Sequence, residues 1–309
     1  MPGLKQLAGR EELVSGGHRA CAGCLPMTAM RQIMLTAGKD TVHGCATGCV
    51  EVVTTIYPFT AWRNPFIHSA FENSAATISG VEAAYRSLRK QGRVDKEINF
   101  IAMGGDGGTY DIGLQSLSGA MERGHNMLYV CYDNEAYMNT GIQRSGGTPK
   151  GTATSTTPAG KVIPGKKQFP KPLTDIMIAH RIPYVAQATP GFPKDLSDKV
   201  EKALSIEGPA FMNILAPCTR GWRYPMEESM EIARLAVDTC FWPIYEVENG
   251  VYKISRKPKN KRPVSEWMEK QGRFAHLFKD KNKHIIDEIQ EDTDRNWEWL
   301  LKREELSQS

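Results

Sequence analysis

Residues 98–134 read INFIAMGGDGGTYDIGLQSLSGAMERGHNMLYVCYDN, and this stretch decides the fold of the 309-residue chain. Its apolar runs 98–103 and 127–132 predict two buried strands, and residues 112–123 between them predict a helix. A strand, a helix and a second strand in this order form the unit of a parallel sheet with crossover helices.

Polar and small residues follow both of these strands. The first strand leads into Gly105, Asp106, Gly107 and Gly108, and the second leads into Asn134. Parallel strands end at the same edge of a sheet, where ligands bind, so we expect Asp106 and Asn134 to lie close together. Their oxygens, with a backbone carbonyl such as that of Ala136, suit Mg²⁺ on a diphosphate. The glycines allow phosphate to approach the backbone closely.

The helix–strand alternation continues on both sides of this unit. It predicts helices at 28–37, 69–90, 172–180, 193–206 and 226–239, and strands at 41–43, 183–187 and 210–215. A turn is expected at 44–49 (GCATGC). Residues 140–171 are rich in Gly, Thr, Pro and Lys without a period, which predicts a functional loop that covers a cofactor or meets another subunit. The fold class is therefore α/β, a parallel sheet with helices on both faces.

The character of the chain changes after residue 225. A hairpin is expected at 244–255, with Asn249-Gly250 at its turn. The charged helices after 264 carry few apolar residues and predict an arm that faces another subunit. We therefore divide the chain into a cofactor-binding domain at 1–225 and a C-terminal extension at 226–309.

Composition excludes several classes of function. Hydrophobic residues make up 40% of the chain and charged residues 24%, with a net charge of +4, as in ordinary globular proteins. No apolar run is long enough to span a membrane, and the first residues lack a signal-peptide pattern. The basic run 256–262 (RKPKNKR) has no interleaved aromatic residues, so nucleic-acid binding is not expected. We expect a cytoplasmic protein that binds neither membrane nor nucleic acid.

Four of the seven cysteines have a spacing that suits metal chemistry. They are Cys21, Cys24, Cys49 and Cys218. Structural zinc favours two compact pairs, whereas a [4Fe–4S] cluster accepts remote single cysteines that the fold brings together. Spacing alone leaves zinc and a cluster equally open, and a cluster beside a cofactor that releases electrons has the clearer chemical purpose. Cys45, Cys131 and Cys240 are expected to be packed thiols.

Several motifs together carry a resemblance to a known family. Asp106 and Asn134 resemble the thiamine-diphosphate fingerprint. The further segments are HRACAGC (18–24), ATGCVEV (46–52), YPFTAWRNPFIHSAFENSA (57–75), GGDGGTYDIG (104–113), YMNTG (137–141) and APCTRGW (216–222). Over residues 15–265 the chain resembles the β subunits of pyruvate:ferredoxin oxidoreductases, within the 2-oxoacid:ferredoxin oxidoreductase family.

The resemblance implies roles for particular residues. Cys21, Cys24, Cys49 and Cys218 would bind a [4Fe–4S] cluster, and Asp106, Asn134 and the Ala136 carbonyl would bind the Mg²⁺ of thiamine diphosphate. Asn139 and Thr140 would line the cofactor and substrate pocket, with Asn139 contacting the substrate. His68 either approaches the substrate or is a hydrogen-bonded structural histidine.

The implied reaction converts pyruvate, CoA and oxidised ferredoxin to acetyl-CoA, CO2 and reduced ferredoxin. The family takes an activating glutamate from a facing subunit, and this chain offers no strong candidate. It also lacks a double ferredoxin motif. We therefore expect an α subunit and γ and ferredoxin-like δ subunits, or fused equivalents. Two alternatives stay open: the same chemistry on 2-oxoglutarate, a branched-chain 2-oxoacid or oxalate, and a non-catalytic iron–sulfur electron-transfer subunit.

Overall fold

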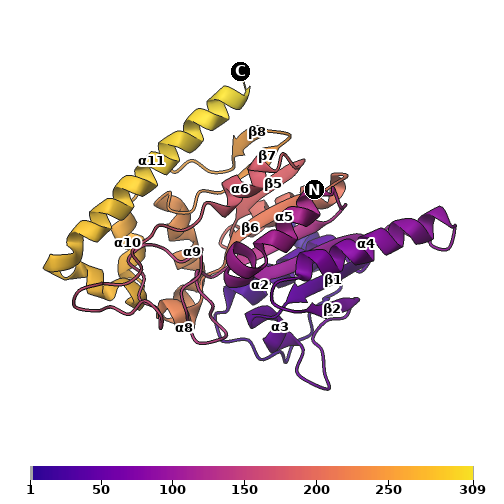
Figure 1. Ribbon diagram of the computed structural model, residues 1–309, viewed down its shortest axis with the longest axis horizontal. Coiled ribbons are helices and arrows are strands. Elements are labelled where there is room, and N and C mark those ends of the chain that lie inside the picture. Colours follow the sequence, from indigo (N-terminus) through magenta and orange to yellow (C-terminus); the bar gives the residue numbers. More distant parts are fainter. Residues whose placement is uncertain (1–2, 309) are drawn as a thin grey trace.

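Eight strands form one sheet in the computed structural model, which describes residues 3–308 (Figure 1). In chain order they are β1 (Thr41–Ala46), β2 (Phe66–Ser69), β3 (Asn99–Gly105), β4 (Leu128–Asp133), β5 (Tyr184–Ala188), β6 (Ala210–Leu215), β7 (Tyr245–Glu248) and β8 (Val251–Ile254). Their order in space is β2-β1-β3-β4-β6-β5-β7-β8. The first six are parallel, and the hairpin β7–β8 adds antiparallel to β5.

The strand order reverses between β1 and β3. From β1 the chain adds β2 on one side and then returns to place β3 on the other. Such a reversal opens a crevice at the carboxyl ends of the strands, because the connections leave in opposite directions. The loops after β1 and β3 therefore border the place where a ligand is expected.

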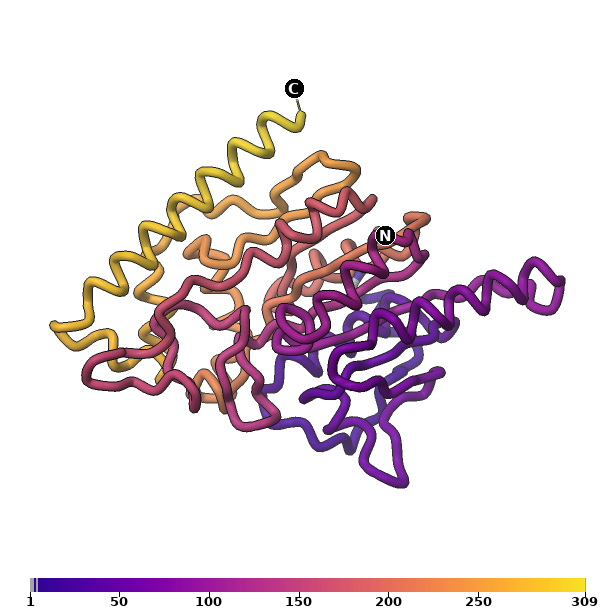
Figure 2. Tube along the Cα trace, in the orientation of Figure 1, coloured from indigo at the N-terminus to yellow at the C-terminus, as the bar shows by residue number. Residues whose placement is uncertain are grey.

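Helices cover both faces of the sheet, as the sequence predicted (Figure 1; the Cα trace is in Figure 2). One face packs against α2 (Leu25–Ala37) and α7 (Pro193–Ser205). The other packs against α4 (Ser74–Lys90), α5 (Leu114–Glu122) and α6 (Leu173–Ala179). Along β3, Ile101 and Met103 join the first core and Phe100 and Ala102 the second. This strand is therefore buried on both faces, which explains its continuous apolar sequence.

The remaining helices are short or lie in the C-terminal region. They are α1 (Leu4–Ala8), α3 (Cys49–Thr54), α8 (Thr219–Trp222), α9 (Ser229–Asp238), α10 (Val264–Glu269) and α11 (Lys283–Gln308). A π-helix spans Gly107–Ile112, and 3-10 turns span Met226–Glu228, Gly272–Phe278 and Asp280–Asn282. Among the described residues, no helix is both long and apolar enough to cross a membrane.

Three predicted boundaries near β1 and β2 were wrong. The strand expected at 41–43 continues through Ala46, so the first half of the predicted turn 44–49 is strand. A Cβ on Gly44 would lie 3.0 Å from Ile78 on α4, so glycine here reflects close helix–strand packing. The helix expected from residue 69 starts at Ser74, because Phe66–Ser69 forms the edge strand β2.

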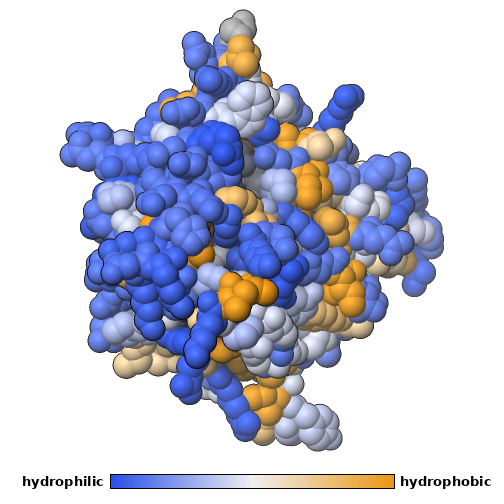
Figure 3. Space-filling view, turned by 60° about the vertical axis from the view of Figure 1, so that its left-hand side comes forward, coloured by the Kyte–Doolittle hydropathy of each residue, from blue (hydrophilic) through white to orange (hydrophobic). Residues whose placement is uncertain are grey.

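The C-terminal region packs against the rest of this chain. The predicted hairpin is β7–β8, and it extends the main sheet. On α11, Ile285 and Ile289 join a core around Trp222 and Trp267, and Leu300 packs with the hairpin. The face that carries this region is mostly hydrophilic with separate hydrophobic patches (Figure 3). The division at residue 225 stays a prediction.

The last turns of α11 also contact the backbone of the edge strand β8. Glu304 Oε1 accepts a hydrogen bond from the Ile254 amide at 2.7 Å, and Ser307 Oγ accepts one from the Tyr252 amide at 2.9 Å. The Gln308 side chain donates to the Tyr252 carbonyl at 3.0 Å. These side chains hold the helix across the edge of the sheet.

The basic run 256–262 forms ion pairs within the chain. Arg256 pairs with Asp238, Lys257 with Glu304, Lys261 with Asp294 and Arg262 with Glu266. Much of its charge is therefore balanced locally.

Candidate functional site

A cavity of about 150 Å³ lies where β1, β3 and β4 end. The residues that line it come from the loops after these strands and from the segment after β4. They are Thr47, Gly48, Cys49, Phe71, Gly105, Asp106, Gly107, Gly108, Tyr132, Asn134, Ala136, Tyr137, Met138, Asn139 and Thr140. The strand reversal between β1 and β3 thus coincides with the loops that the sequence singled out.

Three oxygen atoms converge in the wall of this cavity. The side-chain oxygen of Asn134 lies 2.9 Å from the Ala136 carbonyl oxygen and 3.1 Å from Asp106 Oδ1. All three atoms are acceptors, so they repel one another unless a hydrogen or a cation lies between them. Turning the Asn134 amide would let its nitrogen donate to both neighbours. A cation held by all three oxygens would satisfy them without that turn, and oxygen ligands of this kind suit Mg²⁺.

Asp106 is buried and sits in a network of hydrogen bonds. Burial raises the pKa of its carboxyl well above the ordinary value, and the nearby Asp133 raises it further. Two contacts oppose this: the Ser145 hydroxyl donates to Oδ2, and the backbone N–H of Asn134 donates to Oδ1 at 3.4 Å. A divalent cation at the three oxygens would likewise favour the ionised carboxylate.

The glycines beside Asp106 leave room that side chains would fill. A Cβ on Gly107 would lie 2.6 Å from the Tyr137 ring, and one on Gly108 would lie 3.0 Å from the Phe71 carbonyl oxygen. The helix predicted at 112–123 starts earlier, because residues 107–112 form the π-helix and α5 follows from Leu114. Such wide turns are often found at functional sites.

Of the residues expected to approach the substrate, two line this cavity and one does not. Asn139 and Thr140 line it and are exposed. His68 does not line it. His68 Nε2 instead hydrogen bonds Thr47 Oγ1 at 2.8 Å, and Nδ1 lies 3.6 Å from the buried Glu51 carboxylate. His68 therefore reaches the cavity only through Thr47.

The four candidate cluster cysteines come from three parts of the chain and influence one another electrostatically. Burial first, and then the neighbouring Cys218, Cys24, Asp106 and Cys21, raise the pKa of the Cys49 thiol to about 12. The pKa of Cys24 is raised to about 11, mainly by burial and to a smaller extent by Cys218 and Cys21, while a hydrogen bond from the Met27 backbone opposes the rise. Within residues 3–308, however, no three His, Cys, Asp or Glu side chains are close enough to hold a metal together. The thiols are the donors that a cluster needs, and they would have to draw closer to bind one.

The backbone around these cysteines is held by contacts between distant segments. The Ser229 hydroxyl donates to the Gly23 carbonyl at 2.9 Å, which joins the Cys21–Cys24 loop to α9. The Gly221 amide donates to Cys218 Sγ at 3.4 Å, a contact that also favours a thiolate. Cys49 lines the cofactor cavity together with Asp106. The other three cysteines, Cys45, Cys131 and Cys240, are buried, as expected of packed thiols.

Sequence reasoning missed two features of the site. Ser145, which bonds Asp106, belongs to the irregular segment 140–171, and its type and spacing gave no signal. The second feature is a buried ion pair at 2.5 Å between Glu135 and Arg273, the latter lying 3.8 Å over the Trp222 ring. The sequence feature that could have indicated this pair is the position of Glu135 directly after the candidate metal ligand Asn134.

Comparisons with known proteins show the family to which this chain belongs. Residues 43–214 match the family described as thiamine pyrophosphate enzyme, C-terminal TPP binding domain. The chain is 52% identical to the pyruvate synthase subunit PorB of Thermotoga maritima (98% of this chain, 97% of the relative). It is 58% identical to the protein of the same name from Methanocaldococcus jannaschii (87% and 91%).

One further relative and one solved structure are also similar to this chain. The ketoisovalerate oxidoreductase subunit VorB of Pyrococcus abyssi is 43% identical (96% of this chain, 94% of the relative). A solved 2-oxoglutarate:ferredoxin oxidoreductase from Magnetococcus marinus matches with a TM-score of 0.57 at 22% identity (72% of this chain, 79% of that one), which shows a shared fold. The chain therefore belongs to the thiamine pyrophosphate enzymes and, within them, to the family of the pyruvate synthase PorB subunits.

Proposed function

We propose that this chain is the thiamine-diphosphate-binding subunit of a pyruvate:ferredoxin oxidoreductase. With its partners it would convert pyruvate and CoA to acetyl-CoA and CO2 and pass electrons through a [4Fe–4S] cluster to ferredoxin. One observation carries the proposal: Cys49 lines the same cavity as the Asp106–Asn134–Ala136 oxygens. A thiol of the candidate cluster thus lies beside the candidate diphosphate site, so electrons would have a short path.

The residues of this chain would bind and orient the cofactor. Asp106, Asn134 and the Ala136 carbonyl would hold Mg²⁺, and Gly105, Gly107 and Gly108 would leave room for the diphosphate. When bound, thiamine diphosphate supplies the electron sink for the loss of CO2. Asn139 and Thr140, exposed at the rim, would contact the substrate, and His68 would act on it only through Thr47.

The cavity also indicates what partners must supply. Among the described residues that line it, Asp106 is the only carboxylate, and it is itself one of the candidate metal ligands. A glutamate that activates the far end of thiamine would have to come from another chain. We therefore propose that an α subunit faces this cavity and that γ and ferredoxin-like δ subunits, or fused equivalents, carry electrons onward in the cytoplasm.

A panel of 2-oxoacids tests the reaction and its substrate. The anaerobically purified complex would be given CoA, a viologen acceptor and pyruvate, 2-oxoglutarate, 2-oxoisovalerate or oxalate. We expect pyruvate to give the highest kcat/KM. The 43% identity to a ketoisovalerate oxidoreductase subunit makes a branched-chain 2-oxoacid the second candidate. CoA-dependent reduction with none of these acids would contradict the enzymatic role and favour a non-catalytic iron–sulfur subunit.

Two matched variants test the cluster. Cys218→Ala should remove the broad visible absorbance of the cluster and lower the iron content of the complex. Cys45→Ala is the control, since Cys45 is buried in the sheet and lies outside the four-cysteine set. An unchanged spectrum in Cys218→Ala would refute this ligand assignment.

A further inference from the structure

The candidate metal ligands Asn134 and Ala136 lie on either side of a residue with a strained backbone. Glu135 between them has a φ of 64°, in the left-handed region that favours glycine. For a residue with a side chain this conformation costs free energy. It turns the chain directly after β4, and the Ala136 carbonyl oxygen lies 2.9 Å from the Asn134 side-chain oxygen. The conformation of residue 135 therefore decides whether both oxygens can reach one cation.

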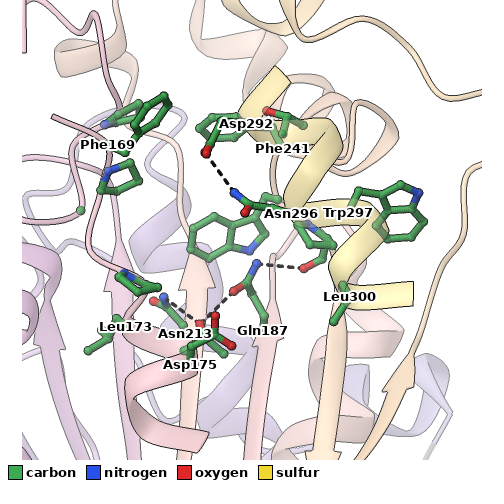
Figure 4. A pocket seen from close by; sticks show the side chains of 18 of the residues that line it. Phe169, Leu173, Asp175, Gln187, Asn213, Phe241, Asp292, Asn296, Trp297 and Leu300 are labelled. Atoms are coloured by element: carbon green, nitrogen blue, oxygen red, sulfur yellow. Dashed lines mark hydrogen bonds between the residues drawn. The ribbon is translucent and has the colours of Figure 1, made fainter. Parts of the chain in front are cut away.

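Packing is incomplete beside this turn. Glu135 also lines a second cavity of about 230 Å³, which lies between α11 and the sheet (Figure 4). Gln187 and Asn213 border this space from the sheet, and Leu300 borders it from α11. Open space beside a strained residue gives its backbone room to relax. Specific contacts must therefore fix the conformation of Glu135.

An ion pair holds the Glu135 side chain from the C-terminal region. Arg273, in the 3-10 turn Gly272–Phe278, pairs with the Glu135 carboxylate at 2.5 Å, and both residues are buried. The Gln271 side chain accepts a hydrogen bond from Arg273 Nε at 2.8 Å, so the guanidinium is itself fixed. Separating the two partners would leave a buried charge unpaired. The pair therefore opposes any movement that carries Glu135 away from Arg273.

Further contacts hold the backbone on both sides of the Glu135 peptide. The Arg273 guanidinium lies 3.8 Å over the Trp222 ring, and the Trp222 indole N–H donates to the Asn134 carbonyl at 2.8 Å. The Thr148 hydroxyl donates to the Glu135 carbonyl at 2.6 Å. The turn is therefore held at one side chain and at two carbonyl groups by residues that lie outside it.

We propose that Arg273 is a positioning residue of the cofactor site. Together with Trp222 it keeps Glu135 in the left-handed conformation that brings the two candidate ligands together. The match to the thiamine pyrophosphate enzyme domain ends at residue 214, so both positioning residues lie beyond it. The C-terminal region is thus part of the metal site and more than a surface for other subunits. This inference rests on the proposed Mg²⁺–diphosphate site.

Two double variants that differ only at residue 135 test the role of the ion pair. Glu135→Ala with Arg273→Met leaves no unpaired charge, but alanine keeps the cost of a left-handed backbone. Glu135→Gly with Arg273→Met removes the same charges and also removes that cost. The cofactor-free complex would be titrated with thiamine diphosphate at fixed Mg²⁺ by isothermal titration calorimetry. We expect the alanine variant to bind roughly fivefold more weakly than the glycine variant, equivalent to about 1 kcal/mol.

Rescue by glycine separates positioning from a purely structural role. An ion pair that only stabilises the fold is lost equally in both double variants, so equal affinities would overturn the role of Arg273. The unmodified complex is the reference. If it does not bind thiamine diphosphate with Mg²⁺, the proposed cofactor site fails and this inference fails with it. If it binds and glycine does not rescue, only this inference fails.

Trp222→Phe tests the second contact and keeps an aromatic ring beside Arg273. Trp242→Phe is the matched control, because the Trp242 indole is also buried and donates to the Ala188 carbonyl at 3.0 Å, away from the metal site. We expect a roughly fivefold loss of cofactor affinity in Trp222→Phe, the effect of one hydrogen bond of about 1 kcal/mol, and no loss in the control. Equal affinities in these two variants would overturn the role of Trp222.

Discussion

Removing the hydroxyl of Ser145 should weaken binding of thiamine diphosphate with Mg²⁺. The Ser145 hydroxyl donates to Asp106 Oδ2, and the other oxygen of this carboxylate belongs to the three that converge in the cavity. The bond therefore orients a candidate metal ligand. A hydrogen bond to a charged group contributes about 1.5–3 kcal/mol. If the whole free energy of this hydrogen bond serves to orient Asp106 as a metal ligand, Ser145→Ala should weaken cofactor binding roughly 10- to 100-fold. Losses of this size are typical of residues that support metal ligands.

The assay is a titration of the cofactor-free complex with thiamine diphosphate at fixed Mg²⁺, followed by tryptophan fluorescence. Ser79→Ala is the matched control, because the Ser79 hydroxyl is also buried and donates to the Ala75 carbonyl at 2.7 Å within α4. This control loses a comparable hydrogen bond away from the site. Unchanged cofactor affinity in Ser145→Ala, or an equal loss in Ser79→Ala, would refute the positioning role.

Two other predictions concern stability and the glycine loop. Burial lowers the pKa of His43 to about 3, from 6.5. The folded chain therefore disfavours protonation, and stability is lost as the pH falls below 6.5, by about 2 kcal/mol at pH 5. The buried acid Asp106, whose pKa is raised, contributes with the opposite sign. Urea unfolding at pH 7.5 and 5 should therefore show a change that is about 2 kcal/mol less favourable in the unmodified chain than in His43→Gln, and equal changes in the two would contradict the role of His43. Gly107→Ala should weaken cofactor binding in the fluorescence titration, because its Cβ would meet the Tyr137 ring at 2.6 Å. Gly80→Ala, with nothing within 4 Å, should keep affinity and raise stability by up to about 1 kcal/mol in thermal unfolding.

Much of the sheet could be predicted because its strands are buried on both faces. The run 210–215 matches β6 residue for residue, and the runs at 98–103 and 127–132 differ from β3 and β4 by one or two residues at their ends. Continuous apolar segments between turn signals leave few other structures for the chain. The family resemblance, carried by motifs between residues 18 and 222, is likewise confirmed by the relatives.

The errors arose where tertiary contacts override local sequence. Gly44 indicated a turn, yet it lies in β1 because α4 passes too close for a side chain. The edge strand β2 is four residues long and was assigned partly to the following helix. Ser145 could not be found, since only the folded path of segment 140–171 brings it to Asp106. The sequence thus predicted the polar groups of the site that lie at strand ends better than those that lie in loops.

The contacts between α11 and β8 have a consequence for the assembled state of the protein. An edge strand with free amides is a template on which a second sheet can grow. Here Glu304 and Ser307 occupy two amides of β8, and the helix itself lies across the strand. The last turns of α11 thus block edge-to-edge pairing of β8 with a strand of another molecule. Replacing Glu304 and Ser307 with alanine would free these two amides and is therefore expected to lower solubility.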